Sequence, residues 1–306
     1  MKVLVTGGAG FVGSHVVDRL IEVGHSVVVV DNLSTGRREN LAPEAKFYQV
    51  DICSPKLLEV LDSERPACIS HHAAQVSVPA SIQDPLRDAN TNIMGSLNLL
   101  AACVNIGIKK FIYISTGGAV YGEPEYLPCD EDHPINPLCP YGVSKHSVEH
   151  YLYLYSSLHG LNYTVLRYPN VYGPRQGVQG EAGVVAIFAQ RMLGGNEVVI
   201  NGSGEQERDF LYVSDAAEAN LLALDRGDRR TYNLGWGEGV SVNRLFGLLK
   251  DITGYSGREI HGPPVPEVFK SCLEARSART ELGWKPRIAL EEGLLRTVDH
   301  YRRIAG

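Results

Sequence analysis

The 306-residue chain has few cysteines, and they are not clustered. No two of them form a C-x-x-C pair, which excludes the usual zinc motifs and gives no sign of a disulfide framework. His71 and His72 are adjacent, but no third candidate ligand stands at a metal-binding spacing, so no metal site is predicted. We expect reduced thiols of a cytoplasmic protein at the six positions, which are Cys53, Cys68, Cys103, Cys129, Cys139 and Cys272.

The sequence also lacks long apolar runs and basic stretches. No apolar run approaches the ~20 residues that a helix needs to cross a bilayer. Met1 leads directly into an apolar segment, so we expect neither a membrane span nor a signal peptide. The formal net charge of −6 argues against nucleic acid and anionic membranes as partners. Hydrophobic residues make up 44% of the chain, which is ordinary for a globular protein with a large core.

A glycine-rich turn stands near the start of the chain. The apolar run 2–6 is typical of a buried strand, and it is followed by Gly7, Gly10 and Gly13 and by a helical pattern that ends at Gly24. Glycines at this Gly-x-x-Gly-x-x-Gly spacing allow a tight turn, close approach to a ligand, and close packing of helix on strand. A pyrophosphate would then lie at the helix N-terminus, where free N–H groups favour anions. The pattern predicts a dinucleotide-binding turn.

An acidic residue follows this turn at a suitable distance. The second apolar run, 26–30, ends at Asp31, which is 18 residues after Gly13. A carboxylate there can accept a hydrogen bond from a ribose 2′-hydroxyl and would repel a 2′-phosphate, so NAD is favoured over NADP. Arg37 and Arg38 lie close behind, and they keep NADP open as an alternative unless they belong to a solvated loop.

Tyr141 and Lys145 stand four residues apart, which on a helix places both side chains on one face. A free tyrosine has a pKa of about 10 and is a poor base near neutrality. A lysine ammonium and an oxidised nicotinamide are both positive, and together they favour the phenolate. The spacing alone is common by chance. Together with the glycine-rich turn, it predicts that Tyr141 takes a hydroxyl proton while hydride leaves the same carbon.

Strand and helix patterns alternate along the first half of the chain. They predict an α/β fold, a Rossmann-like doubly wound parallel sheet with a smaller C-terminal substrate-binding lobe. We place the NAD-binding domain at residues 1–172 and the substrate lobe at residues 173–306, part of which we expect to return to the first sheet. Further strands are expected at 47–50, 67–71, 111–115 and 163–168, helices at 90–106, 141–159, 184–193, 214–224, 242–253 and 290–304, and connections at 124–140 and 257–266.

Seven segments resemble the extended short-chain dehydrogenase/reductase superfamily and, within it, the family of UDP-glucose 4-epimerases (UDP-galactose 4-epimerases). The resemblance covers essentially the whole chain. Two of the segments mark only the superfamily, and three are more specific to nucleotide-sugar enzymes. The superfamily segments are 5–15 and 140–145, the more specific ones are 31–36, 167–176 and 208–215, and the other two are 73–78 and 115–122.

The resemblance implies interconversion of UDP-glucose and UDP-galactose, with UDP-GlcNAc and UDP-GalNAc as further candidate substrates. In the family's mechanism, Tyr141 would deprotonate the sugar 4-hydroxyl while the C4 hydride passes to tightly held NAD. The transient 4-keto sugar then turns over, and hydride returns from bound NADH to its other face. Lys145 would hold the nicotinamide ribose and lower the tyrosine pKa. The family also implies a homodimer formed through the helices at 90–106 and 141–159.

The same resemblance assigns residues to the two ligands. The NAD site would contain Gly7, Gly10, Phe11, Val12, Gly13, Asp31, Asn32, Leu33, Ser34, Gly36, Asp51, Ile52, Ala73, Ala74, Gln75, Asn92, Ser115, Tyr141, Lys145 and Tyr168. The substrate site would contain Gly117, Gly118, Asn170, Val184, Val185, Asn201, Arg208 and Ser271. Arg208 suits the diphosphate because a guanidinium pairs bidentately with phosphate oxygens. The alternative for Arg208 is a surface salt bridge with its acidic neighbours.

The chain departs from the family pattern at several positions. Gly117 replaces the usual Ser or Thr that bridges tyrosine and sugar, so Thr116, a water molecule or Tyr141 alone would have to serve. Pro264 replaces a second diphosphate arginine, which leaves Arg208 alone or assisted by Arg175 or Lys270. Asn201 stands where an aromatic residue often packs on uracil. Ser271 is small where a tyrosine would exclude N-acetyl sugars.

Other functions stay open at this point. A 4,6-dehydratase or a UDP-glucuronate decarboxylase would need a further acid and base, and Gly117 and Gly118 supply no carboxylate where those relatives carry one. A UDP-glucuronate 4-epimerase is a second alternative, since Arg175 could meet a C6 carboxylate. A non-catalytic NAD-binding sensor is a third, although such proteins typically lack the Tyr141 and Lys145 pair.

Overall fold

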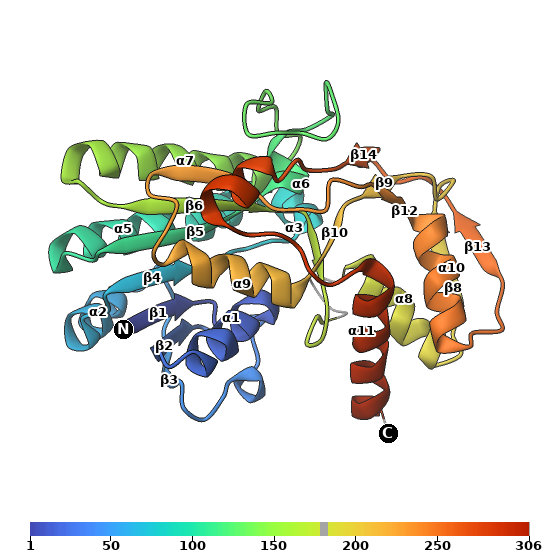
Figure 1. The fold of residues 1–306 in the computed structure, drawn as a ribbon, viewed down its shortest axis with the longest axis horizontal. Helices are drawn as coiled ribbons and strands as arrows, with labels where there is room; N and C mark the ends of the chain where they lie inside the picture. The colour runs from blue at the N-terminus through green and yellow to red at the C-terminus, as the bar shows by residue number, and fades with distance from the viewer. Residues whose placement is uncertain (178–182, 306) are drawn as a thin grey trace.

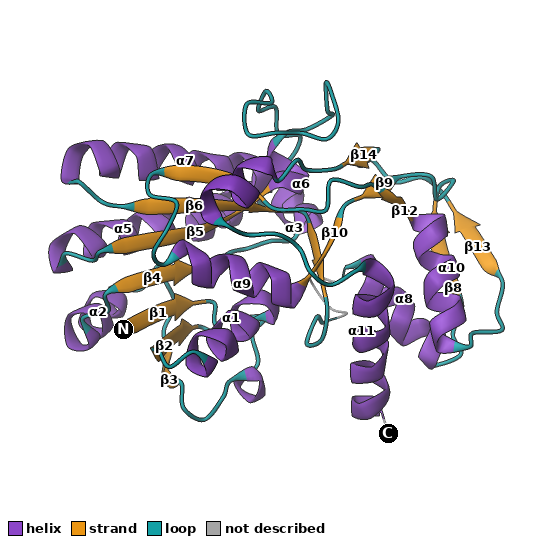
Figure 2. Ribbon diagram, in the orientation of Figure 1, coloured by secondary structure: helices purple, strands orange, loops and turns teal. Residues whose placement is uncertain are grey.

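The computed structural model describes residues 1–177 and 183–305, and a seven-stranded sheet forms its larger part (Figures 1 and 2). All seven strands are parallel, in the order β11-β6-β5-β4-β1-β2-β3. The predicted α/β class with a doubly wound parallel sheet is confirmed. The strands are β1 (Lys2–Thr6), β2 (Ser26–Asp31), β3 (Lys46–Gln49), β4 (Cys68–His71), β5 (Lys110–Thr116), β6 (Tyr163–Tyr168) and β11 (Arg230–Asn233).

Helices cover both faces of this sheet, which is why its central strands are continuous apolar runs. Val3 and Val5 of β1 pack toward the layer that contains α1 (Phe11–Glu22) and α9 (Val213–Ala223). Leu4 points to the opposite face and packs in the layer that contains α2 (Lys56–Glu64), α5 (Gly95–Ile106) and α7 (Pro140–His159). Strand order reverses between β1 and β4, and ligands of such sheets lie outside the carboxyl ends of the strands at this point.

A smaller lobe stands beside the sheet in Figure 1 and has its own core. Its helices are α8 (Val184–Leu193), α10 (Val242–Thr253) and α11 (Leu290–Ala305). The rings of Phe188 and Phe246 meet edge to face between α8 and α10, with centroids 6.1 Å apart. Its short strands are β7 (Asn170–Tyr172) with β10 (Phe210–Tyr212), β8 (Val198–Asn201) with β13 (Glu259–Gly262), and β9 (Glu207–Arg208) between β12 (Val240–Ser241) and β14 (Lys270–Ser271).

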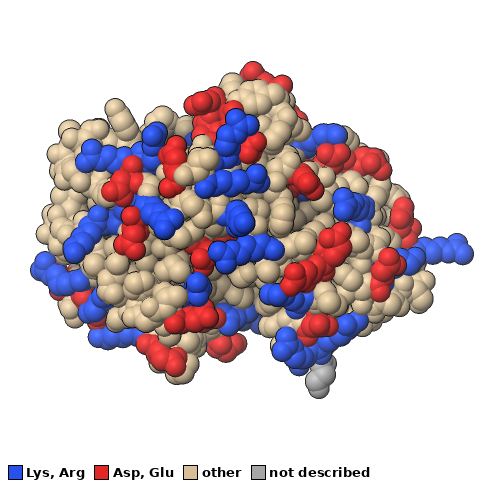
Figure 3. All heavy atoms as spheres, in the orientation of Figure 1, with Lys and Arg blue, Asp and Glu red and all other residues tan. Residues whose placement is uncertain are grey.

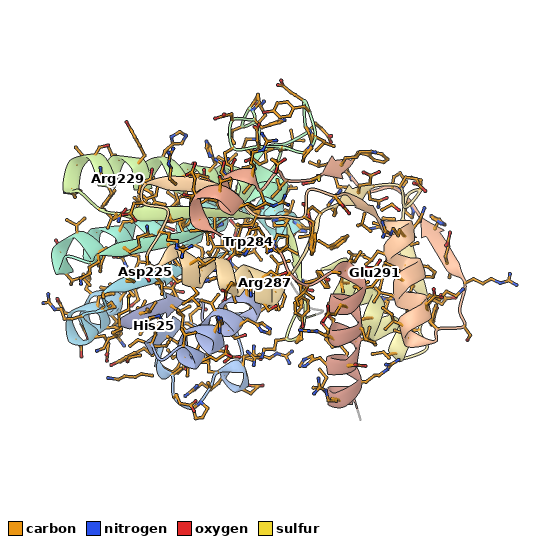
Figure 4. All side chains as sticks on the ribbon, viewed as in Figure 1. His25, Asp225, Arg229, Trp284, Arg287 and Glu291 are labelled. Carbon is orange, nitrogen blue, oxygen red and sulfur yellow. The ribbon has the colours of Figure 1, made fainter. Side chains whose placement is uncertain are left out.

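Two segments of the second half lie against the large sheet. Strand β11 pairs with β6 at the sheet edge, and α9 packs its alanine-rich face on α1. Trp284, labelled in Figure 4, is buried in the same core and donates its indole N–H to the carbonyl of Asp215 over 2.8 Å. The domain boundary at residue 172 stays a prediction.

Several local features differ from what the sequence predicted. The helix expected at 90–106 begins with a π-helical turn, η2 (Asn90–Met94), before α5. The connection expected at 257–266 contains β13, which pairs with β8. Helix α2 and several short helices were not predicted. These short helices are α3 (Val78–Gln83), α4 (Pro85–Ala89), α6 (Gly117–Val120), η1 (Arg38–Asn40) and η3 (Ala278–Leu282).

The surface carries both signs of charge. Figure 3 shows Lys and Arg mixed with Asp and Glu over the visible face.

Within residues 1–177 and 183–305, no helix is both long enough and apolar enough to span a membrane. The same ranges contain no group of three or more His, Cys, Asp or Glu side chains that could hold a metal ion. All six cysteines are free thiols.

Candidate active site

A cavity of ≈ 320 Å³ lies along the carboxyl ends of the sheet strands. It runs from β2 across β1, β4 and β5 to β6, as the strand-end rule predicts. The predicted residues that line it are Gly7, Gly10, Phe11, Val12, Gly13, Asp31, Asn32, Ser34, Asp51, Ile52, Ala73, Ala74, Ser115, Thr116, Tyr141 and Tyr168. Their roles toward a ligand remain proposals.

The glycine-rich turn forms a cradle that leaves no room for side chains. Gly7 has φ +66°, and a Cβ there would lie 2.5 Å from the backbone nitrogen of Ala73. A Cβ on Gly13 would overlap the carbonyl oxygen of Gly7. Helix α1 begins at Phe11, and no side chain of the described residues caps it at Gly10. The N–H groups of its first turn have no intrahelical acceptor, as at any helix start, and Phe11, Val12 and Gly13 line the cavity, so this end of α1 suits an anion.

Asp31 stands at the end of β2 with its carboxylate held from two sides. Oδ2 accepts a hydrogen bond from the N–H of Ala9 at 3.0 Å, and Oδ1 accepts one from the N–H of Leu33 at 2.8 Å. Burial raises the pKa of this carboxyl, and the two backbone hydrogen bonds act in the opposite direction. Beside it, Asn32 Nδ2 donates to Asp51 Oδ2 at 2.7 Å. This end of the cavity thus presents fixed acceptors that suit ribose hydroxyls.

Tyr141 and Lys145 lie one turn apart on α7, as predicted. Tyr141 lines the cavity, whereas Lys145 is buried behind it with Nζ 4.3 Å from the centre of the Tyr113 ring. Burial lowers the pKa of Lys145 to about 7, against the opposing charges of Glu149 and Asp88. The lysine is therefore held in a site where its charge is costly and a small electrostatic change alters its protonation.

A buried ion pair supports this helix one turn further along. Arg167 of β6 meets Glu149 with two bonds, Nε to Oε1 at 3.1 Å and Nη2 to Oε2 at 2.5 Å. Ser115, which lines the cavity, donates from Oγ to Glu149 Oε1 at 2.5 Å. Although burial opposes it, hydrogen bonds from His146 and Arg167 hold the pKa of Glu149 at about 2. The network ties α7 to β5 and β6, and so fixes the turn that carries Tyr141.

The structure gives a steric reason for Gly117. A Cβ on Gly117 would overlap Cδ1 of Leu273 and lie 2.8 Å from its Cδ2. Leu273 is fully buried with Val120, Tyr121 and Cys129. The space for a side chain at position 117 is thus already filled. Thr116 does line the cavity and is the nearest hydroxyl in sequence to the replaced Ser or Thr.

A second cavity of ≈ 440 Å³ lies between β8, β9 and α8 in the smaller lobe. Four of the predicted substrate residues line it, namely Asn170, Val184, Asn201 and Arg208. The two cavities approach each other at Gly118. A Cβ on Gly118 would lie 3.8 Å from Thr116 Oγ1 of the first cavity and 3.8 Å from Asn170 Oδ1 of the second. Two ligands, one in each cavity, would therefore come into contact beside Gly118.

Of the three cations that the sequence suggested for the diphosphate, Arg208 alone lines the second cavity. Arg208 is paired with Glu267, with Nη2 and Oε2 2.5 Å apart, and both residues line the cavity. Arg191 of α8 also lines it, and sequence reasoning missed this residue. Arg175 instead pairs with Asp18 at 2.7 Å, and it does not line this cavity. Lys270, which bonds to Glu207 at 2.8 Å, is absent from its lining too.

Some predicted residues lie near the cavities without lining them. Asn92 Oδ1 accepts from the Gln75 N–H at 2.8 Å, and Asn92 Nδ2 donates to Ser144 Oγ at 3.1 Å. This pair therefore ties the loop after β4 to α7. Val185 is buried in the core of the smaller lobe, and Ser271 lies opposite Arg208 in the sheet of β9 and β14. The predicted residues that line neither cavity are Leu33, Gly36, Gln75, Asn92, Lys145, Gly117, Gly118, Val185 and Ser271.

Other lining residues were not predicted. Lining residues of the first cavity that follow strand ends, such as Pro169 and Val171, could have been predicted. Ligands of parallel sheets lie at the carboxyl ends of the strands, which is also where Asp31 stands. Thr35, Val76 and Gln176 fall in segments that resemble the family, and no sequence signal singles out the rest. The lining residues that were not predicted are, in the first cavity, Val30, Thr35, Val50, His72, Val76, Thr91, Ile114, Pro169, Val171 and Gln176, and, in the second, Gly183, Ile187, Phe188, Arg191, Val199, Gln206, Val242 and Glu267.

Several known proteins are similar to this chain in sequence and in architecture. Residues 3–235 match the NAD dependent epimerase/dehydratase family. The UDP-glucose 4-epimerase of Mycolicibacterium smegmatis is 40% identical over 309 residues, which span 99% of each chain. The crystal structure of UDP-glucose 4-epimerase from Thermotoga maritima with UDP-glucose is 51% identical, covers 100% of both chains and has a TM-score of 0.99. The Thermus thermophilus UDP-glucose 4-epimerase in complex with NAD is 43% identical, covers 99% of both chains and has a TM-score of 0.95.

Proposed function

The chain belongs to the NAD dependent epimerase/dehydratase family, and from that premise we propose that it is a nucleotide-sugar 4-epimerase that interconverts UDP-glucose and UDP-galactose. The observation that supports this most is the approach of the two cavities at Gly118. A cofactor in the first cavity and a nucleotide in the second would bring a sugar between Thr116 and Asn170. Tyr141 lines the cofactor side of this junction.

The first cavity fits NAD. The glycine cradle and the start of α1 would take the pyrophosphate. The close packing of this cradle requires glycine at positions 7 and 13, because a Cβ there would collide with neighbouring backbone. Asp31 would accept from the ribose hydroxyls and disfavour a 2′-phosphate. When bound, NAD accepts hydride from the sugar carbon and later returns it.

Tyr141 and Lys145 handle the proton. We infer that the phenol oxygen of Tyr141 takes the 4-hydroxyl proton and gives it back after the sugar has turned over. The cation of Lys145, one turn away and shielded from water, favours the phenolate electrostatically. Thr116 supplies the hydroxyl that Gly117 cannot carry, because Leu273 fills the space beside Gly117.

The second cavity would hold the UDP portion. Arg208 and Arg191 are positioned for the two phosphates, and Asn201 lies at the end of β8 for the base. Glu267, which pairs with Nη2 of Arg208, would compete with a phosphate for this guanidinium. The small Ser271 opposite Arg208 favours acceptance of UDP-GlcNAc and UDP-GalNAc as further substrates.

We also propose that the protein is a cytoplasmic homodimer that associates through α7. Val143, Tyr153, Leu154 and Leu158 are large apolar residues exposed along this helix, and an apolar helix face of this kind is typical of an interface. Light scattering should give twice the chain mass, and a variant carrying Leu154→Glu and Leu158→Glu should give the chain mass. A wild-type monomer at micromolar concentration would contradict the dimer.

The direct test of the proposed function is cofactor reduction by substrate. Protein purified without added cofactor should carry NAD, and UDP-glucose should produce the blue fluorescence of its reduced form. Tyr141→Phe should abolish this signal with UDP-glucose, because no group then takes the hydroxyl proton. A wild-type protein that binds NAD but neither shows this fluorescence nor forms a C4 epimer with UDP-glucose, UDP-GlcNAc or UDP-glucuronate would refute the proposal.

A further inference from the structure

Gln176 is a buried polar residue that the mechanism above does not use. It follows β7, is 7% exposed and lines the first cavity but not the second. Its Nε2 donates to the carbonyl of Val171 at 3.2 Å, and its own carbonyl accepts from the hydroxyl of Tyr301 at 2.7 Å. Its Oε1 is buried without a hydrogen-bond partner in the part of the chain that the structure describes.

The surroundings fix the orientation of this carboxamide. The carbonyl of Val171 can only accept, so Nε2 must face it and Oε1 must face the other way. The backbone of Gly183 packs against the same group, because a Cβ there would lie 2.6 Å from Nε2 and 3.3 Å from Oε1. A buried acceptor without a donor is costly. Because Gln176 lines the cavity, its unpaired Oε1 points to a bound ligand that supplies the missing hydrogen-bond donor.

The position of Gln176 along the cavity identifies the part of the ligand. Asp31 and Asp51 mark the end at β2 and β3, and the glycine cradle marks the middle at β1. Gln176 follows β7 and contacts Val171, and Tyr168 of β6 and Tyr141 of α7 line the same cavity. The carbonyl of Pro174, two residues earlier, is hydrogen-bonded to His15 of α1 at 3.0 Å, so Gln176 lies between the helix that starts at the cradle and the end of β6. If the adenosine occupies the first end and the pyrophosphate the cradle, Gln176 lies on the side of the cradle that faces the nicotinamide.

We propose that Gln176 Oε1 accepts a hydrogen bond from the carboxamide N–H2 of the nicotinamide and so positions the ring. The inference rests on the proposed binding of NAD in this cavity. The donors of NAD at this end are the carboxamide N–H2 and the ribose hydroxyls. The ribose hydroxyls are the same in NAD and in its acetylpyridine analogue, so a titration with both cofactors distinguishes the two. Holding the carboxamide keeps one face of the ring toward the sugar. Helix α11 takes part because Tyr301 anchors the Gln176 backbone.

The test compares NAD with its acetylpyridine analogue, in which a methyl ketone replaces the carboxamide and the N–H donors are lost. Both are titrated into protein stripped of cofactor, and affinity is measured for wild type, Gln176→Met and Gln206→Met. Methionine has a similar length and no strong acceptor. Gln206 is the matched control because it is also a buried glutamine, but it lines the second cavity.

We expect wild type and Gln206→Met to bind NAD more tightly than the analogue, by about threefold to tenfold. Gln176→Met should lose this preference by weakening NAD alone, while its melting temperature without cofactor stays near that of wild type. Equal weakening of both cofactors, or an unchanged preference, would overturn the proposal. The titrations contain no sugar, so a protein that binds NAD yet epimerises nothing would fail the proposed function and leave this result interpretable.

Discussion

The steric coupling between Gly117 and Leu273 yields a prediction that can be worked from the structure. A methyl group on Gly117 would overlap the end of the Leu273 side chain, which is fully buried in a small cluster. The neighbouring Gly118 lies on the same helix, α6, and a methyl group there would have only ordinary contacts at 3.8 Å. Gly118→Ala is therefore a matched control for Gly117→Ala.

The magnitudes follow from packing. Overpacking costs ~1–3 kcal/mol, and replacing glycine by alanine in a helix returns ~0.5–1 kcal/mol. Gly117→Ala should thus lower the free energy of unfolding by about 0.5–2 kcal/mol, whereas Gly118→Ala should leave it unchanged or raise it slightly. Leu273→Ala opens a cavity and should cost ~2–5 kcal/mol. In the double variant the new methyl group enters that cavity, so the double variant should be more stable than the two single costs imply.

Urea unfolding followed by circular dichroism measures these free energies. We expect the cost of the Gly117→Ala and Leu273→Ala double variant to fall short of the sum of the single costs by roughly 1–3 kcal/mol. Additive costs, within about 0.5 kcal/mol, would show that Leu273 does not limit the space at position 117. An equal cost for Gly118→Ala would show that the effect belongs to the helix and not to the contact.

Three further predictions concern charged groups. Burial lowers the pKa of Lys145 to about 7 in the folded protein. Between pH 7 and about 10.4 the unfolded chain therefore binds more protons than the folded chain. The free energy of unfolding of cofactor-free protein should rise with pH in that window. Lys145→Met should reduce this rise in urea unfolding at pH 7 and 9, and an equal rise in both proteins would contradict the assignment. Glu149→Gln leaves Arg167 without its buried counter-charge and should cost ~3–5 kcal/mol in the same assay, whereas Asp299→Asn at an exposed pair should cost under ~1 kcal/mol. Asp31→Asn should shrink the preference for NAD over NADP about tenfold in cofactor titrations, and an unchanged ratio would remove Asp31 from cofactor selection.

Most of the sheet could be predicted because its strands are apolar runs that are bounded by turn residues. Strand β13 could not, because its residues are largely exposed and its only strand partner in the described chain is β8, far away in sequence. Helix α2 was missed although Leu57, Val60 and Leu61 show helical spacing, so the signal was present there. The π-helical turn before α5 has no counterpart in a 3.6-residue pattern.

The first cavity was accessible to sequence reasoning because the carboxyl ends of parallel strands meet at one sheet edge. The second cavity was less so, since α8, β8, β9 and the segment of Glu267 come together only through tertiary packing. The pairing of Arg208 with Glu267 and the approach of Arg191 to the same cavity depend on that packing. The reason for Gly117 is likewise non-local, because Leu273 lies far along the chain.

Proton NMR of the sugar is the most direct test of whether Tyr141 serves as the base of a C4 epimerisation. Wild type and Tyr141→Phe are each incubated with UDP-glucose in the presence of NAD, and the anomeric signals are followed with time. We expect that UDP-galactose appears with wild type and that the variant loses nearly all of the rate while still binding NAD. Epimerisation at a comparable rate by Tyr141→Phe, or no epimer from a wild-type protein that carries NAD, would contradict this expectation.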